Sequence, residues 1–249
     1  MTTIAVIQAR MGSTRLRGKV LEAIGDRPLI LWTVRAVATV GGLDDLVVAT
    51  SKEAVDDPLV TVLAQHGVRV HRGPTHDVLR RVVDAVAPLG PDIVLRQTGD
   101  NPFPDPAVMA AQLARLAEGP FDYVGIAGLP LGIAAEAVRW EALVAADRES
   151  ADPAEREHVL PFVYARPDRF AIGTLPDPPP WQHGRYTVDR PEDLEFVRAI
   201  AARLTGDGPP SLRDLESIVA ADPGLAGLNR DVEQRDHRRA EVAAGQEGS

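Results

Sequence analysis

The stretch Ile4–Val20, IAVIQARMGSTRLRGKV, decides how the rest of the sequence is interpreted. Its continuous apolar run, Ile4–Ile7, is typical of a strand buried on both faces, and it passes directly into a loop of small residues. Four cations follow within that loop, although the chain has a net charge of -9: Arg10, Arg15, Arg17 and Lys19. This cluster beside a buried strand predicts a binding site for a highly charged anion.

Composition limits the class of protein. A chain of 249 residues fits one sizeable domain, since single cores stop growing near roughly 250–300 residues. There is no cysteine, which excludes disulfides and thiolate metal sites. The acidic balance argues against a nucleic-acid partner. No apolar run is long enough to span a membrane and no signal-like segment opens the chain, so we expect a cytoplasmic protein without a membrane partner.

Lysine is scarce in this chain. Of 27 basic residues only Lys19 and Lys52 are lysines. A lysine between Gly18 and Val20 favours a role for a compact ammonium with three donors rather than a planar guanidinium. The alternative is a solvated loop residue.

Short apolar runs alternate with amphipathic segments of helical length in the first half of the chain. Such alternation predicts right-handed βαβ units around a mainly parallel sheet, that is, an α/β fold. The predicted strands are 4–7, 46–49, 68–70 and 93–95, and the predicted helices are 29–40, 58–67 and 77–90. Because ligands bind beyond the carboxyl ends of such strands, one crevice should be shared by the loops 10–19, 50–51, 72–77 and 98–105.

The pattern changes after Asp122, where shorter strands of mixed direction are expected. We predict helices over 140–149, 155–165, 189–204 and within 211–224, a proline-rich loop at 175–184, and a tail that frays beyond Arg239. The expected division is a main domain, 1–204, with a distinct subregion, 122–190, and a helical extension with a tail, 205–249.

The opening loop matches neither the dinucleotide fingerprint nor the Walker A loop, because five residues separate Gly12 from Gly18 and Val20 follows the lysine. Its small residues still permit an anion-binding nest, to which Arg10, Arg15 and Lys19 add charge-assisted donors. This set suits a polyphosphate whose charge grows as a leaving group departs, so we predict these three cations to be catalytic. The alternative is a surface loop that is basic by chance.

Two aspartates at distant strand ends are candidate ligands for Mg²⁺, which one or two carboxylates plus phosphate oxygens typically hold. Asp100 follows the tight turn of Thr98 and Gly99 within RQTGDNPFPDP, and Asp189 precedes a helix within RYTVDRPEDL. An N-cap is the alternative for Asp189, and it is the preferred interpretation of Asp105.

These motifs resemble the cytidylyltransferase family, in particular its spore-coat polysaccharide SpsF-like branch, which is related to the CMP-sialic acid and CMP-3-deoxy-octulosonate synthetases. The resemblance runs from Ile4 to about Arg235, through IQARMGSTRLRGKVL, VVATS, RGPTHDVLRR, RQTGDNPFPDP, EREHVLPFVYARPDRF, YTVDRPEDLEFVRAI and GLNRDVEQR. It implies a three-layer αβα nucleotide-diphospho-sugar transferase (Rossmann-like) fold. It also implies transfer of CMP from CTP to an anionic acceptor with release of pyrophosphate, Mg²⁺ as cofactor, and a homodimer. Residues 1–204 would then form the nucleotidyltransferase domain, and 122–190 its acceptor-binding and dimerisation subregion.

Carried over by position, the resemblance implies one set of residues around CTP and another around the acceptor. The nucleotide set is Ala9, Arg10, Gly12, Ser13, Arg15, Lys19, Thr50, Ser51, Asp77 and Thr98. The acceptor set is Glu136, Arg156, His158 and Arg185. His158 could serve as a general base, an anion anchor or a packing residue, and at most two of the successive residues 156–158 can face one ligand on a helix.

Two departures from the family pattern concern the loop and the acceptor site. Arg17 stands where the family usually has proline, and Ala134 replaces the acid of its G-x-D-x-E segment, which leaves the identity of the acceptor open.

Two other functions compete with nucleotidyl transfer. A glycosyltransferase of similar fold normally needs a D-x-D-like pair, whereas TGDNP offers one acid. A noncatalytic nucleotide-binding module is the second.

Overall fold

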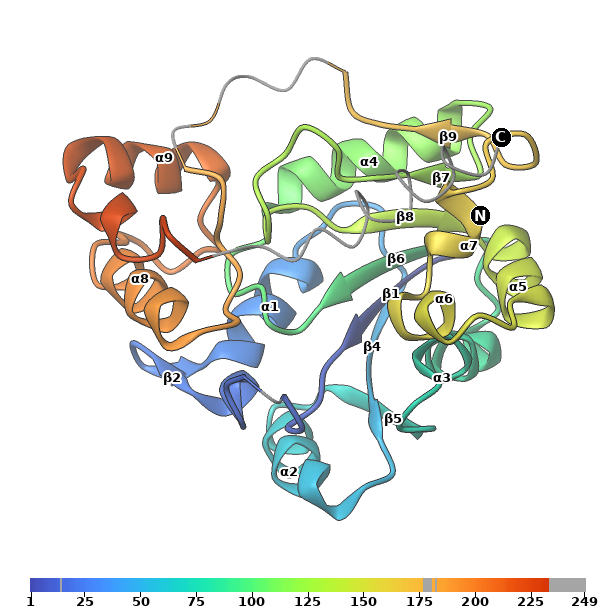
Figure 1. Ribbon diagram of the computed structural model, residues 1–249, viewed down its shortest axis with the longest axis horizontal. Coiled ribbons are helices and arrows are strands. Elements are labelled where there is room, and N and C mark those ends of the chain that lie inside the picture. Colours follow the sequence, from blue (N-terminus) through green and yellow to red (C-terminus); the bar gives the residue numbers. More distant parts are fainter. Residues whose placement is uncertain (14, 177–180, 182, 233–249) are drawn as a thin grey trace.

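A seven-stranded sheet forms the centre of the computed structural model, which describes residues 1–13, 15–176, 181 and 183–232 (Figure 1). The strand order is β5-β4-β1-β6-β8-β7-β9. The strands are β1 (Thr3–Gln8), β4 (Asp45–Ser51), β5 (Arg69–Gly73), β6 (Ile93–Thr98), β7 (Tyr123–Val124), β8 (Glu136–Arg139) and β9 (Ile172–Gly173). β1, β4, β5 and β6 pair in parallel, whereas β8 runs antiparallel to both β6 and β7. The predicted parallel half and the mixed half are therefore both confirmed.

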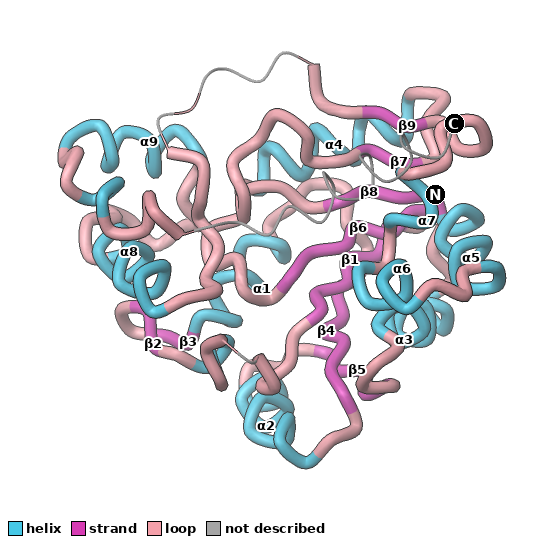
Figure 2. The backbone as a smooth tube through the Cα atoms, in the orientation of Figure 1, coloured by secondary structure: helices cyan, strands magenta, loops and turns pink. Residues whose placement is uncertain are grey.

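Helices cover both faces of this sheet, as Figure 2 shows. Ile4 and Val6 of β1 pack in one hydrophobic cluster with α3 (Val78–Val86), α5 (Trp140–Glu149) and α7 (Pro161–Tyr164). Ala5 and Ile7 point to the opposite face, because side chains alternate along a strand. There they pack with α1 (Leu29–Ala38), α2 (Asp57–Gln65) and α4 (Pro106–Glu118). The predicted three-layer αβα fold is confirmed.

A third hydrophobic cluster lies beside the sheet and contains α8 (Pro191–Ala201) and α9 (Leu212–Ala221). It also includes Phe103 and Tyr186, and the Tyr186 hydroxyl donates to Glu216 at 2.6 Å. A small hairpin of β2 (Ala23–Ile24) and β3 (Arg27–Pro28) borders it. The two predicted C-terminal helices are confirmed, and the domain boundary after residue 204 stays a prediction. The tail beyond Arg239 and part of the proline-rich loop lie outside the described residues.

One predicted helix is wrong in its extent. The segment 155–165 forms two short helices, α6 (Pro153–His158) and α7, instead of one. Pro161 lacks the N–H that a continuing helix would need, and Val159 between the two helices has a φ of 78°. A β-branched residue rarely adopts this left-handed region. The break directs the end of α6 towards the carboxyl ends of the strands, where His158 borders the site described below.

Asp105 begins α4, as its predicted N-cap role requires. One carboxylate oxygen accepts from the N–H groups of Ala107 and Val108 at 2.8 and 3.4 Å, and the other accepts from the Leu212 N–H at 2.7 Å. The side chain is 5% exposed. Asp105 thus joins the start of α4 to the start of α9.

Replacing Asp105 with Ala should lower the free energy of unfolding by about 3 kcal/mol, because a cap is lost and the Leu212 N–H is left unpaired in a buried position. Asp152→Ala is the matched control, since Asp152 caps only the exposed start of α6. It should cost about 1 kcal/mol. Urea denaturation followed by circular dichroism measures both, and equal losses would contradict the assigned role of Asp105.

Candidate active site

The Lys19 ammonium joins three segments that are far apart in the sequence. Its Nζ donates to Asp100 Oδ2 at 2.7 Å, to Asp189 Oδ1 at 2.9 Å and to the Val188 carbonyl at 2.7 Å. Lys19 is 6% exposed, so its three donors are satisfied within the protein. The structure therefore brings the loop after β1, the turn after β6 and the segment before α8 to one point.

The charges around this point hold one another ionised. Burial acts to lower the pKa of Lys19, but the carboxylates of Asp100 and Asp189 outweigh it and hold that pKa above its ordinary value. Burial likewise acts to raise the pKa of Asp189, and the nearby Lys19, Arg15 and Arg185 hold it below its ordinary value. At neutral pH the centre therefore contains a fixed ammonium and a fixed carboxylate.

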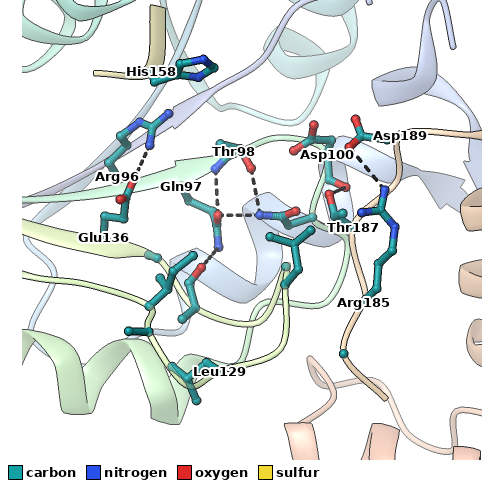
Figure 3. Close-up of a pocket in the computed structure, with 18 of the residues that line it drawn as sticks. Arg96, Gln97, Thr98, Asp100, Leu129, Glu136, His158, Arg185, Thr187 and Asp189 are labelled. Atoms are coloured by element: carbon teal, nitrogen blue, oxygen red, sulfur yellow. Dashed lines mark hydrogen bonds and ion pairs between the residues drawn. The ribbon is translucent and has the colours of Figure 1, made fainter. Parts of the chain in front are cut away.

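Two hollows meet at this centre. The loop hollow, of about 540 Å³, lies against the opening loop and is lined by Gln8, Ala9, Arg10, Ser13, Arg15, Lys19, Val20, Val78, Arg81, Thr98, Gly99, Asp100, Glu157, His158, Asp189 and Arg190. The sheet hollow, of about 500 Å³, lies over β6 and β8 (Figure 3). Its lining includes Arg96, Gln97, Ala134, Glu136, Tyr164, Arg185 and Thr187. Both hollows share Arg15, Thr98, Asp100, His158, Asp189 and Arg190.

A second ion pair fixes the segment that carries Asp189. Arg185 Nε and Nη2 donate to the two carboxylate oxygens of Asp193 at 2.7 and 2.8 Å, and Nη2 also lies 3.4 Å from Asp189. Asp193 is fully buried and accepts from the N–H groups of Asp189 and Arg190 at 2.9 and 3.0 Å. Asp193, rather than Asp189, therefore caps α8, which leaves the Asp189 carboxylate to face the hollows.

A third ion pair lies in the wall of the sheet hollow. Arg96 Nη1 donates to Glu136, whose other oxygen accepts from the Tyr123 hydroxyl at 2.6 Å. Arg96 Nε donates to Gln8 Oε1 at 3.0 Å, and Gln8 lines the loop hollow. Figure 3 shows Arg96 and Glu136 pointing towards each other in this wall. Side chains of four neighbouring strands are thus connected across the two hollows.

Most of the predicted site residues come together here. The loop hollow contains Ala9, Arg10, Ser13, Arg15, Lys19 and Thr98, and the sheet hollow contains Glu136, His158 and Arg185. Asp100 and Asp189 border both. Of the successive residues on α6, Glu157 and His158 face the loop hollow and Arg156 does not, in keeping with the limit of two.

Five predicted site residues line neither hollow. Gly12 lies exposed in the loop. Thr50 and Ser51 are buried, and the Ser51 hydroxyl donates to Asp56, whose carboxylate also accepts from the Met11 N–H at 2.7 Å. Ser51 and Asp56 thus join the end of β4 to the loop after β1, and the expected place of Thr50 and Ser51 beside the base and ribose stays a prediction.

The other two, Asp77 and Arg156, contact each other. Asp77 caps α3 through the Arg80 N–H at 2.9 Å, and its second oxygen accepts from Arg156 Nε at 2.9 Å. Arg156 also pairs with Asp147 at 2.8 Å. These contacts join α3, α5 and α6, and the expected ligand-binding roles of both residues stay predictions.

Several residues of the site were missed by the sequence analysis. Arg96 lies near the end of the buried strand β6, two residues before Thr98 of the T-G-D turn. This position could have identified it as a site residue from the sequence. Asp193 lies in the same motif as Asp189. Arg81 and Arg190 each stand among other arginines, and the sequence gives no signal that separates the ones that face the hollows.

Comparisons with known proteins identify the family of the chain. The family model described as cytidylyltransferase matches residues 4–235. The chain belongs to the cytidylyltransferase family. Its activity class is therefore that of a CTP-dependent nucleotidyltransferase.

Individual members of the cytidylyltransferase family resemble the chain over nearly its whole length. The spore coat polysaccharide biosynthesis protein SpsF of Bacillus subtilis is 32% identical, over 89% of this chain and 95% of that protein. A 3-deoxy-manno-octulosonate cytidylyltransferase of Anaeromyxobacter dehalogenans is also 32% identical, over 96% of this chain and 97% of that one. The solved structure of a cytidylyltransferase from Leptospira borgpetersenii superposes with a TM-score of 0.85 at 26% identity, covering 94% of this chain and 100% of that chain. Within the described residues, no helix is both long and apolar enough to cross a lipid bilayer.

Replacing Arg185 with Met should lower the free energy of unfolding by about 3–5 kcal/mol, because it leaves the fully buried Asp193 carboxylate without its cation. Arg198→Met is the matched control, since Arg198 pairs with Glu22 on the surface, where both side chains are more than two-fifths exposed. That change should cost less than about 1 kcal/mol. Thermal and urea unfolding measure both variants, and similar costs would contradict the structural importance of the buried pair.

Proposed function

We propose that this chain transfers CMP from CTP to a small anionic acceptor and releases pyrophosphate. The observation that carries the proposal is the Lys19 ammonium, which meets Asp100 and Asp189 where the two hollows join. A nucleotide in the loop hollow and an acceptor in the sheet hollow would then have their reacting atoms at this junction.

The proposed reaction is a displacement at the α-phosphorus of CTP. An acceptor oxygen attacks the α-phosphorus, the bond from that phosphorus to the bridging oxygen breaks, and pyrophosphate leaves with the electron pair. Such a step depends on positioning and on neutralising phosphate oxygens, without a covalent enzyme intermediate. Arg10, Arg15 and Lys19 supply positive charge along the path of the triphosphate, where charge accumulates on the leaving group.

Asp100 and Asp189 fit the role of Mg²⁺ ligands. Their carboxylates converge on one point and remain about one quarter exposed, at 26% and 22%. The described residues contain no group of three or more His, Cys, Asp or Glu that could hold a metal by themselves. Two carboxylates completed by phosphate oxygens are the usual Mg²⁺ arrangement in phosphoryl transfer. When bound there, Mg²⁺ would neutralise phosphate charge and align the triphosphate.

The sheet hollow supports a polar acceptor with an anionic group. Arg185 and Arg96 are already paired with Asp193 and Glu136, whereas Arg190, which borders both hollows, forms no ion pair with the described residues. His158 stands at the junction itself. We propose Arg190 as the residue that meets the acceptor's negative charge, and His158 as a residue beside the attacking oxygen.

Pyrophosphate release, measured with CTP, UTP, ATP and GTP against a panel of sugar acids, phosphorylated polyols and phosphonates, tests this function. The expected result is release with CTP that requires both Mg²⁺ and one acceptor class. A glycosyltransferase would instead release a nucleoside diphosphate from a nucleotide sugar. A noncatalytic module would bind CTP and release nothing, and either result would overturn the proposal.

Lys19→Ala and Asp100→Ala should each lower kcat by at least about a hundredfold, because each removes charge stabilisation or metal alignment from the transition state. Lys52→Ala is the matched control, since Lys52 is the only other lysine and is exposed outside both hollows. The coupled pyrophosphate assay measures turnover, and circular dichroism checks folding. Turnover near that of the unmodified enzyme in both variants would contradict these roles.

A further inference from the structure

Arg81 on α3 is a buried cation in the wall of the loop hollow. It is 2% exposed, and its Nη1 donates to the carbonyl oxygens of Pro74 and Thr75 at 2.6 and 3.3 Å. Its Nε has no hydrogen-bond partner in the structure. Among the described residues, no carboxylate forms an ion pair with it. The Nε N–H of this guanidinium therefore lacks the partner that a buried polar group normally has.

Close packing fixes the Arg81 side chain in a buried position that is energetically unfavourable for a cation. A Cβ on Gly73 would lie 2.8 Å from Arg81 Cγ, so the glycine lets the backbone of β5 approach the arginine stem closely. Burial and the nearby charge of Arg10 lower the pKa of Arg81, and the charges of Asp56 and Asp77 oppose this only in part. A buried cation that forms no ion pair with the described residues and leaves its Nε N–H unpaired destabilises the ligand-free protein. Its retention in the hollow wall points to a partner that a ligand supplies.

The position of Arg81 indicates which part of a nucleotide it meets. It packs at the end of β5, and three strand spacings, roughly 14 Å, separate β5 from β6, which precedes Asp100. The triphosphate end of the hollow is at Lys19 and Asp100. Val78, one helical turn from Arg81, also lines the hollow and is apolar. An apolar side chain beside a guanidinium suits a flat ring with a carbonyl edge.

We propose that Arg81 recognises the base of the bound nucleotide by donating a hydrogen bond to a carbonyl oxygen of that base. This inference rests on the proposed function, because it takes CTP as the occupant of the loop hollow. A pocket built to donate to a carbonyl discriminates strongly against a ligand without that group, since its buried donor would then stay unpaired. Arg81 is thus a specificity-determining residue that lies away from the phosphates.

Isothermal titration of Arg81→Gln with CTP and with ribose 5-triphosphate, both with Mg²⁺ and without acceptor, tests the inference. CTP affinity should fall at least tenfold, equivalent to about 1.4 kcal/mol. Affinity for ribose 5-triphosphate, which has no base, should stay within twofold of that of the unmodified chain. Arg81→Lys keeps a buried cation without the planar fork, and it should show the same selective loss if Arg81→Gln does not fold. Arg80→Gln is the control, because Arg80 is exposed and pairs with Asp84 outside the hollows.

The outcomes separate the inference from the proposed function. Equal losses for CTP and ribose 5-triphosphate would make Arg81 a phosphate ligand, and unchanged CTP affinity in both Arg81 variants would make it a packing residue; either result overturns the inference alone. If the unmodified chain binds neither compound, the proposed function fails and the inference fails with it.

Discussion

The arrangement of the whole site depends on one buried ammonium. Lys19 lies 81 and 170 residues from the two aspartates it contacts. An amine in this position loses its hydration, and only three well-placed acceptors offset that loss. Asp100, Asp189 and the Val188 carbonyl provide them. The loop after β1 is consequently held against the end of β6 and the start of α8. This contact forms the junction at which the two hollows meet.

Asp189, which precedes α8, keeps its position because a separate ion pair, between Arg185 and Asp193, fixes its segment of the chain. Asp193 is fully buried, neutralises Arg185 and accepts the backbone N–H groups that begin the helix. Asp189 therefore needs no part in capping, and its carboxylate is available to Lys19 and Arg15. Charges alternate in sign from Asp193 to Lys19, so each ionised group lowers the energy of its neighbours in a region of low dielectric.

The sequence predicts the fold and the centre of the site for the same reason. Apolar runs such as Ile4–Ile7 identify strands, and charged residues directly after them must lie at the sheet edge that binds ligands, as Lys19 and Asp100 do. Ser51 also lies at the carboxyl end of a strand, β4, yet its hydroxyl faces inward and donates to the buried Asp56, because side-chain direction depends on local register. Periodicity likewise leaves neighbouring arginines on α3 equivalent. Only the structure shows that Arg80 is exposed whereas Arg81 is buried.

The two hollows handle charge differently, which suits them to different ligands. In the sheet hollow the arginines at 96 and 185 already have carboxylate partners, so a ligand there meets a nearly neutral, hydrogen-bonding wall. The loop hollow is lined by five cations, Arg10, Arg15, Lys19, Arg81 and Arg190, and by only three carboxylates, Asp100, Glu157 and Asp189. The side chains of Arg81 and Arg190 have no carboxylate partner among the described residues, so the excess positive charge repels itself until an anion enters. A polyanion therefore gains both direct contacts and relief of that repulsion, and by linkage it stabilises the folded chain as it binds. Nucleotide binding, more than acceptor binding, should thus determine the stability of the loaded enzyme.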